Sequence, residues 1–216
     1  MPGRGRKTVR RFATAAIGAL VLLLSTLEPV SAQVRMDDPP PGEFGMTVRG
    51  LTGTGCLAGT AEVIPNSNKT AFTVAYNAYT AQASNGGVAR AACLLTVAVS
   101  VPHGFTFGIN QTTFRGWANL GAGATGQLNT QYWFVGQPQT GVIRRDLNGA
   151  YSDNWQAADT IGIAAVQWMD CRANYPLNIN SQLIVRAGSS SGTNEMTMDA
   201  TDSNITTLYN LSWKRC

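Results

Sequence analysis

Histidine is almost absent from the sequence: the only one, His103, lies in a Pro-His-Gly stretch. The G-x-S-x-G and H-E-x-x-H motifs of serine and zinc hydrolases are also missing. A histidine acts as a general base only beside a nucleophile and an orienting carboxylate, whereas proline and glycine favour turns. We therefore expect His103 to be an exposed turn residue, and we assign no catalytic residue.

Acidic residues are scarce as well, with eight between Glu62 and Asp202. A glycosidase needs two carboxylates about 5–10 Å apart across a cleft. The positions of these acids, Glu62 and Glu195 included, do not indicate such a pair. The leading interpretation is therefore a non-catalytic binding or surface-interaction protein, and the alternative is a small secreted hydrolase.

Metal-binding motifs are missing too, since the chain has four cysteines, no C-x-x-C pair and one histidine. The stretches 146–153 and 199–204 contain Asp and Asn oxygens of the kind that calcium uses. Neither stretch fits the EF-hand pattern, and Asp and Asn in turns usually bind backbone amides. We expect no metal and no cofactor.

Long hydrophobic runs are confined to the first 32 residues. An apolar stretch at about 15–24 follows five basic residues and precedes the small-residue cleavage site Val30-Ser31-Ala32. The stretch is shorter than the roughly 20 residues that a spanning helix needs. We expect residues 1–32 to be a signal peptide, the protein to be secreted and extracellular, and the mature chain to have no membrane span.

The excess of positive charge belongs to this leader. The whole chain has 16 Lys and Arg against 12 Asp and Glu, and the leader holds five of the basic residues and one acid, which leaves eleven of each sign in residues 33–216. Nucleic acids are bound through an excess of basic residues. We therefore expect no nucleic-acid partner.

Helical periodicity is missing after the leader, and period-two alternation takes its place. In the stretch 93–120 the alternation runs through 93–101, 105–109 and 114–120, which predicts three strands with Cys93 on an inward face. Similar runs elsewhere predict about ten strands with turns every 8–12 residues or so. The expected fold is all-β, an antiparallel β-sandwich or jelly-roll-like barrel.

Three further segments complete the predicted organisation. Residues 33–53 contain three consecutive prolines and scattered charge, so we expect a flexible Pro-rich lead-in before a single β-sandwich domain over 54–216. The longest stretch without alternation, 136–158, is expected to be a mobile loop at a sheet end. The apolar run 161–169 predicts a buried strand.

Four cysteines follow the leader: Cys56, Cys93, Cys171 and Cys216. Export to an oxidising compartment favours disulfides, and four cysteines allow three pairings. We prefer Cys56–Cys93 and Cys171–Cys216, because each bond joins cysteines that are neighbours in the sequence. The second bond would hold the last residue, which otherwise frays.

Several short motifs occur in a fixed order along the chain. They are G-C-x-x-G-T at 55–60, C-x-L-x-V-x-V at 93–99, V-P-x-G-F at 101–105, F-R-G-W at 114–117 and W-K-R-C at 213–216. Together they resemble the uncharacterised secreted family known as domain of unknown function 4360, over residues 54–216. The family usually has a proline where this chain has Leu57. The resemblance implies export, disulfides and a β-rich fold, and it supplies no catalytic residues.

Aromatic residues whose face is not set by alternation are the remaining candidates for a binding surface; they are Trp117, Trp133, Tyr151 and Trp155. Exposed aromatics can stack on sugar rings or on apolar partners, although aromatics in strands more often belong to the core. The segment 136–158 adds two adjacent arginines. The hypothetical binding site, for a carbohydrate or a surface protein, consists of Trp117, Arg144, Arg145, Tyr151 and Trp155.

Overall fold

The computed structural model describes residues 37–172, 174–198 and 207–216, so the expected signal peptide lies outside the described residues. The described residues form twelve strands in two antiparallel sheets. One sheet has the order β1 (Gly45–Thr52), β5 (Val88–Ser100), β10 (Leu177–Arg186), β7 (Thr125–Phe134) and β8 (Ile143–Asn148). The other contains β2 (Ala61–Pro65), β3 (Ala71–Tyr76), β12 (Thr207–Arg215), β6 (Phe105–Leu120), β11 (Asn194–Thr197) and β4 (Thr80–Ala83), with β9 (Tyr151–Thr160) paired to β6.

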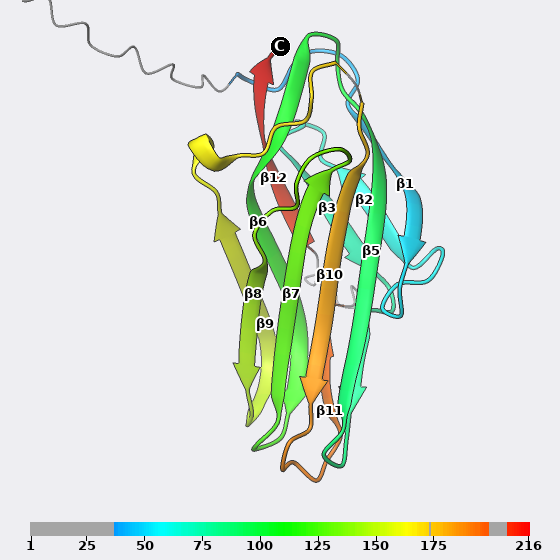
Figure 1. Ribbon diagram of the computed structural model, residues 1–216, viewed down its shortest axis with the longest axis vertical. Coiled ribbons are helices and arrows are strands. Elements are labelled where there is room, and N and C mark those ends of the chain that lie inside the picture. Colours follow the sequence, from blue (N-terminus) through cyan, green and yellow to red (C-terminus); the bar gives the residue numbers. More distant parts are fainter. Residues whose placement is uncertain (1–36, 173, 199–206) are drawn as a thin grey trace, which may run out of the picture. The chain divides into compact units, whose positions relative to one another are not determined.

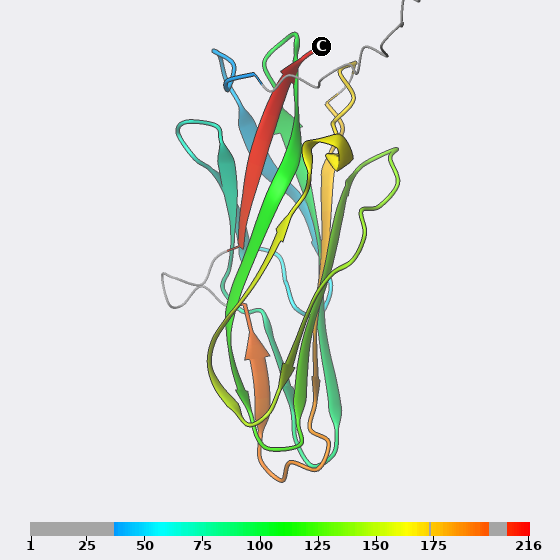
Figure 2. The ribbon, with the colours of Figure 1, turned by 90° about the vertical axis from the view of Figure 1, so that its left-hand side faces the viewer.

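The two sheets lie face to face, with the five-stranded sheet in front in Figure 1. Figure 2 shows the same strands from the side on which β8 and β9 lie. The expected all-β, disulfide-bonded, sandwich-like fold is confirmed. Within the described parts of the chain, no helix is long and apolar enough to cross a membrane.

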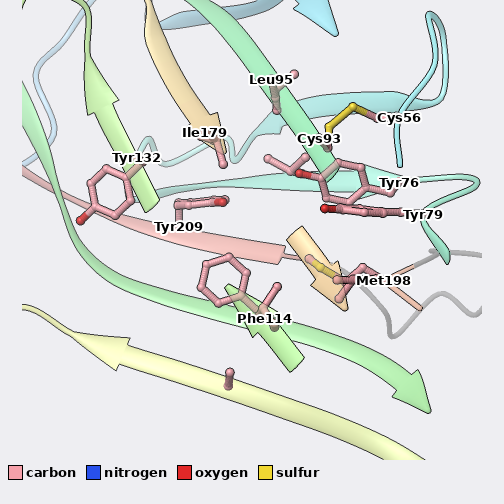
Figure 3. Packing of buried hydrophobic residues seen from close by; sticks show 14 of the residues in the cluster. Cys56, Tyr76, Tyr79, Cys93, Leu95, Phe114, Tyr132, Ile179, Met198 and Tyr209 are labelled. Atoms are coloured by element: carbon pink, nitrogen blue, oxygen red, sulfur yellow. A yellow bond between two sulfur atoms is a disulfide. The ribbon is translucent and has the colours of Figure 1, made fainter. Parts of the chain in front are cut away.

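The core lies between the sheets because each strand directs alternate side chains inward. On β10, Leu177, Ile179, Leu183 and Val185 are almost completely buried. Aromatic side chains join the two layers, and the ring of Tyr132 on β7 meets that of Tyr209 on β12 edge-on, with centroids 6.4 Å apart. Figure 3 shows these rings together with others of the core.

A long strand replaces two of the three strands predicted for 93–120. Strand β6 is continuous, and its pairing with β12 skips Asn110: Leu211 pairs with Ile109 and Asn210 with Gln111. An extra residue of this kind is a β-bulge, which interrupts the alternation of faces without ending the strand. The break in the sequence pattern was therefore a bulge rather than a turn.

Two predicted unpatterned stretches contain strands. Strands β8 and β9 occupy most of 136–158, so the expectation of a loop there was wrong. Strand β1 lies inside the expected flexible lead-in 33–53 and pairs with β5. Among the described strands, all three have a neighbour on one side only. Edge strands tolerate polar residues and bulges that hide the alternation.

The apolar run 161–169 is not a strand, which corrects the prediction made for it. It contains the short 3-10 helix η1 (Ile163–Ala165) and then a single bridge between Trp168 and Gly108. Met169 is buried, and its backbone amide donates to the carbonyl of Phe107 at 3.0 Å. The run is apolar because it covers the end of the core as an irregular segment.

Both disulfides have the pairing that the sequence favoured. Cys56 and Cys93 are bonded, and both side chains are buried, as expected for Cys93 on an inward face. The sulfur–sulfur bond lies beside Tyr76 and Tyr79 in Figure 3. Cys171 is bonded to Cys216, and both of these residues are exposed.

Candidate functional site

The outer surface of the five-stranded sheet has a block of amide side chains, which we call the amide face. Its members lie on the neighbouring strands β7 and β10 and are buried or half-buried: Gln127, Asn129, Gln131, Asn178, Asn180 and Gln182. The residues between them, such as Leu128 and Ile179, are buried in the core. The period-two alternation of a strand therefore places all six amides on the outer side.

The register of β7 and β10 aligns these side chains in ranks. Asn129 lies opposite Gln182, Gln131 opposite Asn180, and Trp133 opposite Asn178. Directly opposite side chains in an antiparallel pair have Cβ atoms about 4.5–5.5 Å apart. The amides therefore form a continuous surface, with the half-buried indole of Trp133 at one end.

Hydrogen bonds fix the edges of the amide face. The Thr96 hydroxyl donates to Asn178 Oδ1 at 2.8 Å, and Gln131 Nε2 donates to Gln139 Oε1 at 2.6 Å. In the centre, the side chains of Asn180 and Gln182 have no hydrogen-bond partner among the described residues. A primary amide has two N–H donors and one acceptor oxygen. The centre can therefore both donate to and accept from a ligand.

A shallow hollow lies at the centre of this surface. Its volume is about 140 Å³, and its lining includes Asn129, Gln131, Asn180, Gln182 and Val142. Val142 belongs to the segment between β7 and β8 and is 59% exposed. The hollow thus combines amide groups with one accessible apolar side chain.

An ion pair borders the amide face on β8. Arg144 Nε donates to Asp146 Oδ2 at 2.8 Å, and Gln127 Nε2 donates to Asp146 Oδ1 at 2.6 Å. The hydrogen bond from Arg144, followed by that from Gln127, lowers the pKa of the Asp146 carboxyl. The charges of this pair offset each other, so the border is polar with little net charge.

The binding residues predicted from the sequence do not form one site. Arg144 borders the amide face, and Arg145, the next residue on β8, is exposed. Trp117 and Tyr151 lie on β6 and β9 of the other sheet, and each is half-buried. The hydroxyl of Tyr151 donates to the carbonyl of Asn154 at 2.6 Å.

Trp155 is 2% exposed, and its inclusion in a binding surface is corrected. It lies opposite Gly116 on β6, where a Cβ atom would come within 2.4 Å of the indole ring. Its indole N–H donates to the carbonyl of Trp117 at 3.2 Å. The glycine makes room for the ring, so Trp155 belongs to the core.

His103 lies exposed in the turn between β5 and β6. Its side chain has no hydrogen-bond partner among the residues that the structure describes. Across 37–172, 174–198 and 207–216, no three His, Cys, Asp or Glu side chains are grouped as metal ligands. The oxygens of 199–204 lie outside the described residues.

The amide face was missed because sequence reasoning searched for aromatic and charged residues. A usable signal was present: Gln127, Asn129 and Gln131 alternate with the core residues of β7, and Asn178, Asn180 and Gln182 do so on β10. Only the sheet order, which the sequence did not indicate, brings the two runs side by side.

Comparisons with known proteins bear on the family and on the location. The model of a family described as "Domain of unknown function (DUF4360)" matches residues 44–216, a span that includes β1. A relative from Arthroderma benhamiae, described as an "Uncharacterized secreted protein", is 28% identical over 194 residues, which cover 84% of this chain and 79% of the relative. Together with the two disulfides, this relative supports the expected location, and the protein is secreted.

Solved structures show only a weak likeness. The carbohydrate-binding module TmCBM61 in complex with β-1,4-galactotriose has 8% identity and a TM-score of 0.33, with 80% of this chain and 88% of the module covered. A family 11 carbohydrate-binding module from Clostridium thermocellum has 11% identity and a TM-score of 0.24, with 81% and 94% covered. TM-scores of this size do not establish a shared fold or function.

Proposed function

Because the chain belongs to the family described as Domain of unknown function (DUF4360), whose activity is not established, we propose a function from its own surface. The protein is a secreted, non-catalytic binding protein that holds a carbohydrate on the amide face. The observation that supports this proposal is the block of six amides on two adjacent strands, next to Trp133.

The chemistry of the surface fits a sugar. A hydroxyl group donates and accepts hydrogen bonds, and so does a primary amide. Asn180 and Gln182 face solvent with unused hydrogen-bonding groups, while Thr96 and Gln139 hold the neighbouring amides in place. Such ordering before binding reduces the entropy lost in the complex. An aromatic face, here that of Trp133, can stack on the apolar side of a sugar ring.

Substitutions at the centre of the amide face test the proposal. Asn180→Ala combined with Gln182→Ala removes two free amides without touching the core. Affinity electrophoresis in gels that contain neutral, acidic or amino polysaccharides identifies the polysaccharide that retards the wild-type protein. We expect the double variant to lose at least tenfold in affinity for that polysaccharide. Trp133→Ala is expected to weaken the same interaction, because it removes the flat apolar surface.

Asn119→Ala is the matched control, since Asn119 is an exposed amide on β6 of the other sheet. It should leave the affinity unchanged. Equal binding by Asn180→Ala/Gln182→Ala and Asn119→Ala would refute the amide face as the site. Shortening of a polysaccharide during incubation would instead favour the alternative of a small secreted hydrolase.

A further inference from the structure

A second hollow lies beside the amide face, around the edge of the five-stranded sheet. It has a volume of about 600 Å³ and lies between β8, the segment before it, the end of β9 and η1. Figure 2 is viewed from this side of the strands. Its apolar walls include Val142, Ile143, Ala158 and Ile161. A cleft of this size with apolar walls and a few polar groups is typical of small-ligand sites.

Two hydrogen-bond acceptors in this cleft are unused. Asp159, on β9, is half-buried and has neither a hydrogen bond nor an ion pair with any described residue. Gln167 Oε1 is buried without a partner, while Gln167 Nε2 donates to the carbonyl of Pro138 at 2.6 Å. That bond fixes the orientation of the amide, so its oxygen remains an acceptor. A buried acceptor without a partner is unfavourable. A ligand donor satisfies it once the cleft wall shifts enough to open this oxygen, which solvent does not reach in the structure.

The arginines of β8 do not pair with Asp159. Arg144, which also lines the cleft, is paired with Asp146 on the border of the amide face, and Asp146 offsets its charge. Asp153 raises and Arg145 lowers the pKa of Tyr151, so both charges lie near that tyrosine, at the opposite end of β9 from Asp159. Tyr132 also lines the cleft. Burial raises the pKa of its hydroxyl, and the nearby negative charge of Asp159 adds a smaller increase. With Arg144 offset by Asp146, Asp159 leaves an unpaired negative charge in the wall of the cleft.

We propose that this cleft is a second binding site, which takes a ring-sized ligand bearing a protonated primary amine, such as an amino sugar. The ammonium group pairs with the Asp159 carboxylate and donates to Gln167 Oε1. The ring lies against Ile143 and Ile161. A charge-assisted hydrogen bond in a partly desolvated cleft is stronger than one between neutral groups. The site is separate from the central amides that we propose for the main ligand.

Three sugars of the same ring size separate amine recognition from general sugar binding. Glucosamine carries the ammonium group, whereas N-acetylglucosamine and glucose do not. In an NMR titration of the ¹⁵N-labelled mature protein, we expect glucosamine to shift the amides of 158–161 and 167 at concentrations where the other two sugars do not. Asp159→Asn keeps the shape but removes the charge, and it should weaken glucosamine binding at least tenfold.

The control is Asp153→Asn, which removes the same charge from another position of β9 and should leave the titration unchanged. Gln167→Leu should weaken binding about threefold, because one hydrogen bond is lost. Equal shifts with N-acetylglucosamine, no shift with glucosamine, or equal affinities of Asp159→Asn and Asp153→Asn would each overturn the proposal. Asn180→Ala should not affect this titration, so failure here is distinguishable from failure of the amide face.

Discussion

Four tyrosines are buried in the core, and their ionisation links stability to alkaline pH. Burial raises the pKa of Tyr76 from its ordinary value of 10.0 to about 12. Burial also raises the pKa values of Tyr79, Tyr132 and Tyr209. The folded protein therefore keeps these protons at a pH where the unfolded chain loses them. The stabilisation is fully present below pH 10 and is lost as the pH rises through 12.

Tyr76→Phe tests this at one residue. Each unit of pKa shift corresponds to about 1.4 kcal/mol, so Tyr76 contributes up to roughly 3 kcal/mol to the loss of stability between pH 10 and 12. In urea unfolding at several pH values, the variant should lose less stability over this interval than the wild type. Tyr175→Phe changes an exposed tyrosine, so its stability should depend on pH as that of the wild type does. If Tyr76→Phe also showed the wild-type dependence on pH, ionisation of Tyr76 would not be linked to stability.

Single residues were predictable where one physical property decides their position. Cys93 stands in a clean alternation and is buried as expected, and His103 is exposed between a proline and a glycine. Trp155 was not predictable, because its burial depends on Gly116, a residue 39 positions away that lies opposite it only in the folded sheet. Likewise, Asn180 gains its neighbour Gln131 only through the sheet order.

The elements differ in how completely their backbones are paired. Strand β10 pairs with β5 and with β7 along its whole length. Strand β8 pairs only with β7, and β9 only with β6, among the strands described. In an antiparallel pair, alternate residues direct their amides to the neighbour. About half of the amides of β8 and β9 thus have no partner strand.

Hydrogen exchange should therefore separate these elements. We expect the amides of β10 to exchange slowest, and those of β8 and β9 to alternate between slow and fast along the strand. Residues of 136–158 outside the strands should exchange fastest. Uniform protection of β8 or β9 at the level of β10 would contradict this expectation, and would mean that a further chain covers the edge.

The central strands β5, β7 and β10 were predictable from alternation, and the edge strands β1, β8 and β9 were not. Inward residues of β5, β7 and β10 are apolar at nearly every second position because both neighbours hold them over the core. β9 has only Trp155 and Ala157 buried, since its edge position leaves the rest to solvent. In β6 the bulge at Asn110 shifts the alternation by one residue, which resembles a turn in the sequence.

The whole molecule is cross-linked at two places that differ in access to solvent. Cys56–Cys93 closes a separation of 37 residues inside the core, and Cys171–Cys216 closes one of 45 residues at the surface. On the chain-entropy model, each bond contributes about 4 kcal/mol. This is a large part of a typical domain stability of about 5–15 kcal/mol. A thiol must reach the sulfur to reduce it, so mild reduction should open Cys171–Cys216 first.

The last prediction concerns the stability that each bond provides. Cys171→Ser/Cys216→Ser should lower the free energy of unfolding by up to about 4 kcal/mol. Hydrogen bonds from Met169 and Cys216 to Phe107 and Gly104 still hold this end of the core, so the fold should survive. Cys56→Ser/Cys93→Ser should lower the free energy of unfolding by more, because this variant also places two serine hydroxyls in a buried apolar site. Urea unfolding of both variants measures the stability that each bond provides. Thiol counting and peptide mapping of the wild-type protein under limiting dithiothreitol measure the order in which the two bonds are reduced. Simultaneous reduction of the two bonds, or a larger loss from the surface pair, would show that burial does not set their contributions.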